Sequence, residues 1–225
     1  MDTGTHLVMG IALGGLATLD PEVASHTGTA TAVMIGTILG SQAPDIDTVL
    51  KMKNNAVYIR NHRGRTHSIP FVILWPILIT ALIALIIPEA NTLHLWLWTF
   101  FAVFLHVFVD IFNAYGTQAL SPLSSRWVAL GIINTFDPFI FGIHIVGLIL
   151  WTFGFDPGTL FLIMYVIMIG YYIARITESR SLKARIRIQI PDARRITLSP
   201  TMRYHRWKVA VTTPDKYYVG VAENR

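Results

Sequence analysis

Residues 69–88 read IPFVILWPILITALIALIIP. The stretch runs for 20 residues with one Thr and no charge until Glu89. At 1.5 Å per residue, a helix of this length measures roughly 30 Å, which is the thickness of the hydrocarbon core of a bilayer. The stretch therefore predicts a transmembrane helix.

The composition of the whole chain extends this prediction. Of its 225 residues, 53% are hydrophobic and 14% are charged, against roughly 25% charged in soluble domains. Residues 93–115, 128–153 and 158–174 are also long enough to cross a bilayer. Residues 6–19 and 29–43 are shorter and rich in Gly, Ala and Thr, which suits either tilted spans or close-packed helices inside the bundle. We expect an all-α polytopic membrane helical bundle of about four long spans plus two short N-terminal helical segments.

The basic residues predict the orientation of this bundle. If all six segments cross, every Lys and Arg falls on one side of the membrane: Lys51, Lys53, Arg60, Arg63, Arg65, Arg126 and the twelve from Arg175 onward. By the positive-inside rule that side is the cytoplasm, and both termini face it.

The C-terminal tail has a different pattern. Residues 184–190 alternate polar with apolar, and residues 206–211 and 216–221 read as two strands around a turn. We expect a small antiparallel sheet of three or four strands at the cytoplasmic membrane surface, and a division into a helical domain (1–178) and a basic β-rich tail domain (179–225). Residues 175–225 carry twelve basic and four acidic residues and suit anionic lipids. It shows no compact Arg and aromatic motif of an RNA-binding module, which argues against nucleic acid as a partner.

Ionisable residues gather at the predicted cytoplasmic ends of the helices, where they suggest function. His106 and Asp110 are four residues apart and share one helix face. The other candidates at the same end of the bundle are His6, Asp45, Asp47, His62 and His67. Because the chain has no Cys, any metal must be held by nitrogen and oxygen ligands. Such a set suits zinc, with manganese or iron as alternatives, and Arg63 and Arg65 could bind a phosphate beside it.

Structural interpretations remain open for each of these groups. His106 with Asp110 could simply join two helices by a hydrogen bond, Asp45 and Asp47 could end a helix, and the arginines could anchor to anionic lipid. Isolated histidines such as His94 and His144 are more often structural. The metal hypothesis rests on the convergence of all these groups at one end of the bundle.

Several motifs, in order, resemble a known family. Thr5-His6 with Gly10, Pro44-Asp-Ile-Asp47, the block from His62 to Ser68, and His106-x-x-x-Asp110 followed by Asn113 and Gly116 are similar to the YdjM family, the LexA-binding inner-membrane metal-dependent hydrolases. The opening MDTGTHLVMG looks like the YfhP branch. The resemblance covers nearly the whole chain and implies a multi-pass protein of the bacterial inner membrane with a divalent-metal hydrolase site.

A more distant resemblance is to zinc phospholipases C, which hold their ions in a helical bundle. This sequence lacks the later His-x-x-x-His or His-x-x-x-Glu pair of those enzymes, which argues for one or two ions. The resulting hypothesis is a hydrolase of a lipid-like phosphoester or ester. Its ligands are His6, Asp45, Asp47, His62, His67, His106 and Asp110, with Asp47 as a candidate general base. The rival hypotheses are a transporter or proton relay using Asp137, and a regulatory or scaffold protein that acts through its basic tail. The oligomeric state has no signal in the sequence.

Overall fold

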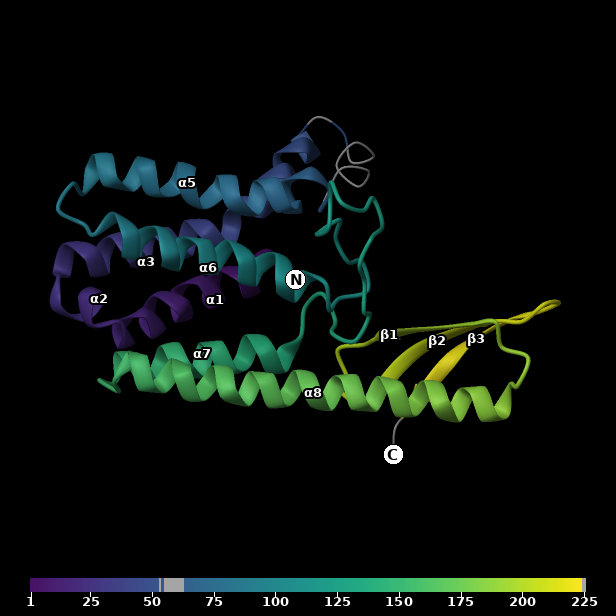
Figure 1. The fold of residues 1–225 in the computed structure, drawn as a ribbon. Coiled ribbons are helices and arrows are strands. Elements are labelled where there is room, and N and C mark those ends of the chain that lie inside the picture. The colour runs from purple at the N-terminus through teal and green to yellow at the C-terminus, as the bar shows by residue number, and fades with distance from the viewer. Residues whose placement is uncertain (53, 55–62, 224–225) are drawn as a thin grey trace.

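A computed structural model describes residues 1–52, 54 and 63–223, so His62 lies outside the described residues. The structure is mainly helical and ends in a three-stranded sheet (Figure 1). The helices are α1 (Thr3–Leu16), α2 (Pro21–Ser25), α3 (Thr27–Gln42), α5 (Ile69–Ile86), α6 (Thr92–Asp110), α7 (Pro138–Thr152) and α8 (Pro157–Gln189). Three 3-10 segments, η1 (Ala17–Leu19), η2 (Ala43–Met52) and η3 (Arg65–His67), and the strands β1 (Arg195–Pro200), β2 (Arg206–Thr212) and β3 (Tyr217–Glu223) complete the described elements.

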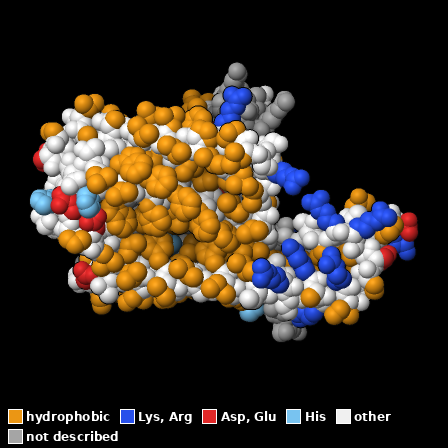
Figure 2. All heavy atoms as spheres, viewed as in Figure 1, with side chains coloured by type: hydrophobic (Ala, Val, Ile, Leu, Met, Phe, Trp, Pro, Cys, Tyr) orange, Lys and Arg blue, Asp and Glu red, His pale blue; other side chains and the backbone are white. Residues whose placement is uncertain are grey.

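Within the described residues, α5, α6 and α8 are long and apolar enough to cross a membrane. Their outward faces are unusually apolar for a protein surface: Leu85 is 83% exposed and Ile169 is 62% exposed. Figure 2 shows this hydrophobic surface over the helical part of the molecule, with Lys and Arg gathered over the sheet. Such a surface suits lipid better than water. The chain is a membrane protein; six crossings and cytoplasmic termini stay predictions.

The predicted spans at 93–115 and 128–153 both extend too far into the loop that joins α6 to α7. Helix α6 ends at Asp110, because the Asn113 side chain accepts hydrogen bonds from the backbone N–H groups of Tyr115 and Gly116 and so stabilises a turn. Gly116 has φ +65°, and a Cβ on it would lie 2.2 Å from the Val128 carbonyl oxygen. Residues 128–137 are therefore packed as irregular chain. Helix α7 begins only at Pro138, after its N-cap Asp137.

The predicted strand at residues 184–190 is wrong, because α8 continues as one helix to Gln189. Leu182 and Ile186 are buried four residues apart and pack in the same core cluster as Trp207 and Val211 of the sheet. The helical spacing of these contacts with the sheet overrides the short alternating pattern. The helix runs through residue 178 without a break, and the division into domains at that residue stays a prediction.

The C-terminal hairpin is confirmed by β2 and β3, which pair antiparallel with Trp207 opposite Ala222. Strand β1 adds to the other side of β2, so the order is β1-β2-β3. Trp207 is completely buried, and its indole N–H donates to Glu178 of α8 at 3.1 Å. The sheet therefore packs against the C-terminal half of α8, the half for which the basic residues predict the cytoplasmic side.

Helices α1, α3 and α6 pack together and position the polar end of the bundle. A Cβ on Gly10 would lie 2.3 Å from Ser41 Oγ and 2.9 Å from the Thr37 carbonyl oxygen, so only glycine allows α1 to approach α3 this closely. The approach brings His6 of α1 beside the end of α3 and His106 of α6. In Figure 1 the N-terminus lies at this end of the bundle, on the side of the sheet.

Candidate metal centre

Four buried side chains from three elements converge at the end of α6. Asp45 lies in η2, His67 in η3, and His106 and Asp110 in α6, and one ligand atom of each lies within 4.8 Å of all the others. His67 Nε2 is 3.3 Å from His106 Nε2, 3.5 Å from Asp45 Oδ1 and 3.4 Å from Asp110 Oδ2. Ligands about 2.0–2.2 Å from a tetrahedral ion stand roughly 3.3–3.6 Å from one another. The spacing therefore fits a single small divalent ion.

Hydrogen bonds on the far side of each imidazole set its tautomer. His106 Nδ1 lies 2.6 Å from the Ser41 carbonyl oxygen, which can only accept, so Nδ1 carries the proton. His67 Nδ1 lies 3.1 Å from Thr66 Oγ1, and this hydroxyl donates its own proton to Asp47 Oδ2 at 3.3 Å. Both neutral rings consequently direct an Nε2 lone pair toward the other at 3.3 Å. Two facing lone pairs repel each other, and a shared cation would relieve that repulsion.

The two carboxylates complete an acceptor-only set. Asp45 Oδ1 and Asp110 Oδ2 are buried and accept no hydrogen bond from the part of the chain that the structure describes. Both carboxyls would bind a metal in their ionised form.

His6 lies beside this four-residue cluster. Its ring stacks on His106 with centroids 3.6 Å apart, and its Nε2 is 3.4 Å from Asp110 Oδ1. The Met1 amino group contacts both Asp110 and His6 Nε2. His6 thus faces the second oxygen of Asp110, away from the cluster around Oδ2. Sequence reasoning missed Met1, because a backbone terminus carries no motif.

Asp47 and Arg63 belong to the wall of the site. Asp47 Oδ2 accepts from the backbone N–H of Arg63 at 3.0 Å as well as from Thr66. Arg63 has a left-handed backbone with φ 62°, a conformation that costs a non-Gly residue energy and clusters at functional sites. Its carbonyl accepts from Thr117 Oγ1 at 3.0 Å and from the Gln118 N–H at 3.0 Å. These contacts hold the strained residue in place.

The Arg63 side chain is turned into the protein. Its Nε is 3.3 Å from Asp110 Oδ2, and one Nη donates to the Met1 carbonyl at 2.9 Å. Arg65, the other predicted phosphate-binding arginine, is exposed. The structure therefore brings Arg63 to the cluster and leaves Arg65 at the surface. The predicted roles of His6, Asp47, Arg63 and Arg65 as ligands or catalytic groups stay predictions.

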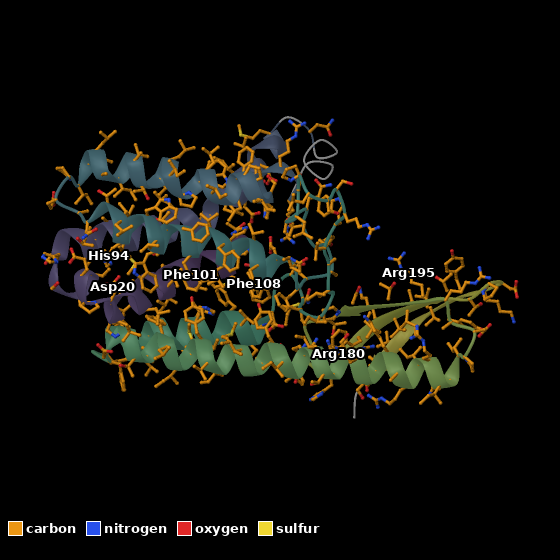
Figure 3. All side chains as sticks on the ribbon, viewed as in Figure 1. Asp20, His94, Phe101, Phe108, Arg180 and Arg195 are labelled. Carbon is orange, nitrogen blue, oxygen red and sulfur yellow. The ribbon has the colours of Figure 1, made fainter. Side chains whose placement is uncertain are left out.

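Asp20, His94 and Asp137 have structural partners. Asp20 accepts from Trp98 Nε1 at 3.1 Å and lies 2.6 Å from His94 Nδ1. Figure 3 shows Asp20 and His94 at the end of the bundle away from the sheet. Asp137 caps α7 and accepts from the Tyr171 hydroxyl at 2.8 Å, and neither it nor His144 belongs to the four-residue cluster. This arrangement gives the transporter hypothesis no specific support.

Comparisons with known proteins agree with the resemblance in the motifs. The model of a family described as YdjM inner membrane protein matches residues 1–182, which cover most of the chain. The chain belongs to the YdjM inner membrane protein family. A model described as YfhP middle domain matches residues 191–225, the part that holds the sheet of this YdjM-family chain.

Among relatives, the chain is 60% identical over 221 residues to "Uncharacterized protein YfhP" of Bacillus subtilis (strain 168). The match covers 98% of this chain and 68% of that protein. No solved structure matches the chain. The YfhP-like assignment made from the motifs is thus confirmed.

Proposed function

We propose that this YdjM-family chain is a membrane-embedded, divalent-metal-dependent hydrolase that cleaves a phosphoester or ester of a lipid-like substrate at the cytoplasmic face. The observation that carries the proposal is the convergence of Asp45, His67, His106 and Asp110: all four are buried, and one ligand atom of each lies within 4.8 Å of the others. Asp110 already pairs with Arg63 and the Met1 amino group, and an ion shared by all four residues would also pair the buried Asp45 Oδ1.

Asp45, His67, His106 and Asp110 would hold one ion. Bound there, zinc, manganese or iron would polarise a substrate oxygen and lower the pKa of a bound water, the chemistry that hydrolyses esters and phosphoesters. His6 Nε2 and Asp110 Oδ1, on the other side of the carboxylate, both contact the Met1 amino group, so a second ion would have to displace that group. The distances from Asp110 to the other ligand atoms favour a single ion shared by the four residues.

Asp47 and Arg63 support the site in different ways. Asp47 accepts from Arg63 and Thr66, so we assign it the positioning of this loop in preference to the general base of the sequence-based hypothesis. Arg63 carries a buried guanidinium at the cluster, where it could turn toward a phosphate and bind it through two N–H groups.

The substrate class follows from the surroundings. The cluster lies at the end of α6, a helix apolar enough to cross a membrane, so the groups that meet it are lipid headgroups and ester linkages. Exposed arginines of the tail, such as Arg180 and Arg195 (Figure 3), suit anionic lipid headgroups.

Metal content tests the proposal. The full chain, purified in detergent and reloaded with zinc, manganese or iron, is expected to retain stoichiometric metal by elemental analysis, whereas His67→Ala and Asp110→Ala retain none. His94→Ala is the matched control: it removes a histidine from the same helix as His106 but leaves the cluster intact. Wild-type chain that retains no metal would overturn the proposal.

The hydrolysis itself needs a second readout. Wild-type chain in vesicles is expected to release product from a phospholipid, and chelator or His67→Ala is expected to abolish it. Retained metal without release from any ester or phosphoester lipid would leave a metal site and remove the hydrolase. A regulatory protein would then be the stronger interpretation.

A further inference from the structure

An apolar groove with a volume of about 410 Å³ lies between α6 and α8. Phe101, Phe104 and Phe108 line its α6 side, and Met168, Ile169 and Ile173 its α8 side. Its only side-chain hydroxyls belong to Tyr165 and Tyr172, and the Tyr165 hydroxyl is engaged by the Met9 carbonyl oxygen at 3.2 Å. The wall offers almost nothing for a polar ligand.

The groove opens sideways, toward where the bilayer would be. Phe101 is 41% exposed, Phe108 is 44% exposed and Ile169 is 62% exposed. Figure 3 shows Phe101 and Phe108 along α6 on the face turned to the viewer, above α8. The lining runs from Phe101 to Val109 on α6 and from Tyr165 to Ile176 on α8, which is about 16 Å along α8. That length is close to half of the roughly 30 Å hydrocarbon core, which is one leaflet.

One side of the groove adjoins the histidines of the metal centre. A small cavity bounded by His6, His106 and Ser41 shares Met9 and Leu105 with the groove. These two apolar side chains therefore line both the groove and the cavity at the stacked imidazoles. The Tyr172 hydroxyl at the groove contacts the Met1 sulfur at 3.8 Å, and the Met1 carbonyl accepts from Arg63. The groove is thus apolar along its length, and its Tyr172 side reaches Arg63 of the metal centre through Met1.

We propose that the groove binds one acyl chain of a phospholipid from the adjacent leaflet and thereby sets its ester or phosphoester linkage at the metal centre. The groove lies on the face that α6 and α8, both apolar enough to cross a membrane, would turn to the hydrocarbon, where acyl chains are the surrounding molecules. One extended chain fits the length and the apolar lining of the groove. The role as substrate site rests on the proposed function; binding of the chain does not.

A photoactivatable phospholipid tests this inference directly. The full chain is placed in nanodiscs containing phosphatidylglycerol with a diazirine in one acyl chain, illuminated, and mapped by mass spectrometry. Adducts are expected to concentrate on the groove faces of α6 and α8 and to fall on addition of unlabelled phosphatidylglycerol. Ile169→Trp, which fills the groove from its exposed rim, is expected to lower this labelling about tenfold, because overpacking a filled site is costly.

Leu82→Trp is the matched control, because Leu82 is 56% exposed on α5 and does not line the groove. It is expected to leave groove labelling unchanged. Adducts spread over α5, α6 and α7 in proportion to exposure would mean ordinary surrounding lipid and overturn the inference. Cross-links between two chains through the groove would overturn it in favour of a second copy.

The two proposals fail separately. Saturable groove labelling in a chain that retains no metal would remove the hydrolase and keep the lipid site. Metal binding and hydrolysis with uniform labelling would remove the groove and keep the hydrolase. His67→Ala is expected to lose metal and to keep groove labelling.

Discussion

Two buried charged clusters in this protein differ in whether their polar atoms find partners. Where α8 meets the sheet, Arg175 donates to Glu178 at 2.6 Å and to the carbonyls of Tyr204 and Ile132 at 2.7 and 3.1 Å. Its guanidinium also lies 4.2 Å from the centre of the Trp207 ring, and Trp207 donates to Glu178. One cation balances one anion there, and each is hydrogen-bonded.

At the metal centre the balance is different. Asp110 pairs with Arg63 and the Met1 amino group, but Asp45 Oδ1 accepts no hydrogen bond from the described residues and lies 3.5 and 3.6 Å from the Nε2 atoms of His67 and His106. Burying unpaired polar atoms is expensive. The comparison teaches that full pairing marks a buried cluster as structural, whereas a buried carboxylate oxygen that faces two imidazoles without a hydrogen bond indicates a place for a ligand.

The largest expected effect is at the Arg175–Glu178 cluster. Glu178→Ala leaves the Arg175 guanidinium buried without its anion, which should lower the free energy of unfolding by roughly 3–5 kcal/mol. Glu223→Ala is the matched control, since its ion pair with Arg206 is exposed and worth at most about 1 kcal/mol. Thermal unfolding in detergent measures both. A Glu178 variant as stable as the control would contradict a structural role for this cluster.

Asp45→Asn, unlike Glu178→Ala, should not lower the free energy of unfolding when metal is removed by chelator. The substitution neutralises a carboxylate that has an unpaired oxygen, so the chelated variant should be within about 1 kcal/mol of chelated wild type or more stable. With metal at 100 times its Kd, wild type should gain about 2.7 kcal/mol and the variant almost none. A large loss of stability under chelation would make Asp45 a structural residue like Glu178.

Thr66→Val tests the hydrogen bond that orients His67. Loss of the hydroxyl frees the imidazole to change its tautomer, and disruption of such outer partners typically costs 10–100-fold in metal affinity, about 1.4–2.7 kcal/mol. Thr99→Val is the control, because Thr99 is buried and its hydroxyl has no hydrogen-bond partner in the described structure. Competition with a fluorescent chelator gives both affinities. Equal affinities would show that Thr66 does not position the ligand.

The smallest effect is expected at Asp20, at the other end of the bundle. Burial acts to raise the pKa of Asp20, but hydrogen bonds from His94 and Trp98 lower it by more, so the pKa lies below its ordinary value. Its contribution to stability is therefore present above an ordinary carboxyl pKa of about 4 and lost as the pH falls through the lowered value. Asp20→Asn should flatten the fall of the unfolding temperature below about pH 4, with metal content unchanged. An unaltered pH profile would show that these hydrogen bonds contribute nothing measurable.

Much of the helical scaffold was predictable because its signals are local. The apolar run at residues 69–88 predicted α5, and the two alternating stretches around a turn predicted the hairpin of β2 and β3. The errors fell where distant contacts decide: α6 stops at a turn made by Asn113, and α8 continues because Leu182 and Ile186 pack against the sheet.

The sequence by itself determined that this is a membrane protein and that His106 and Asp110 share a helix face, because span length and the spacing of four residues are properties of a single helix. Only the tertiary structure decided which of the other candidates meet them. Asp45 reaches the cluster while Asp47, two residues on, binds the loop of Arg63 and Thr66. The Ser41 carbonyl that sets the tautomer of His106 belongs to the backbone and has no signature in the sequence. Three chain segments converge because of tertiary packing, and the residue spacing within any one segment does not determine that packing.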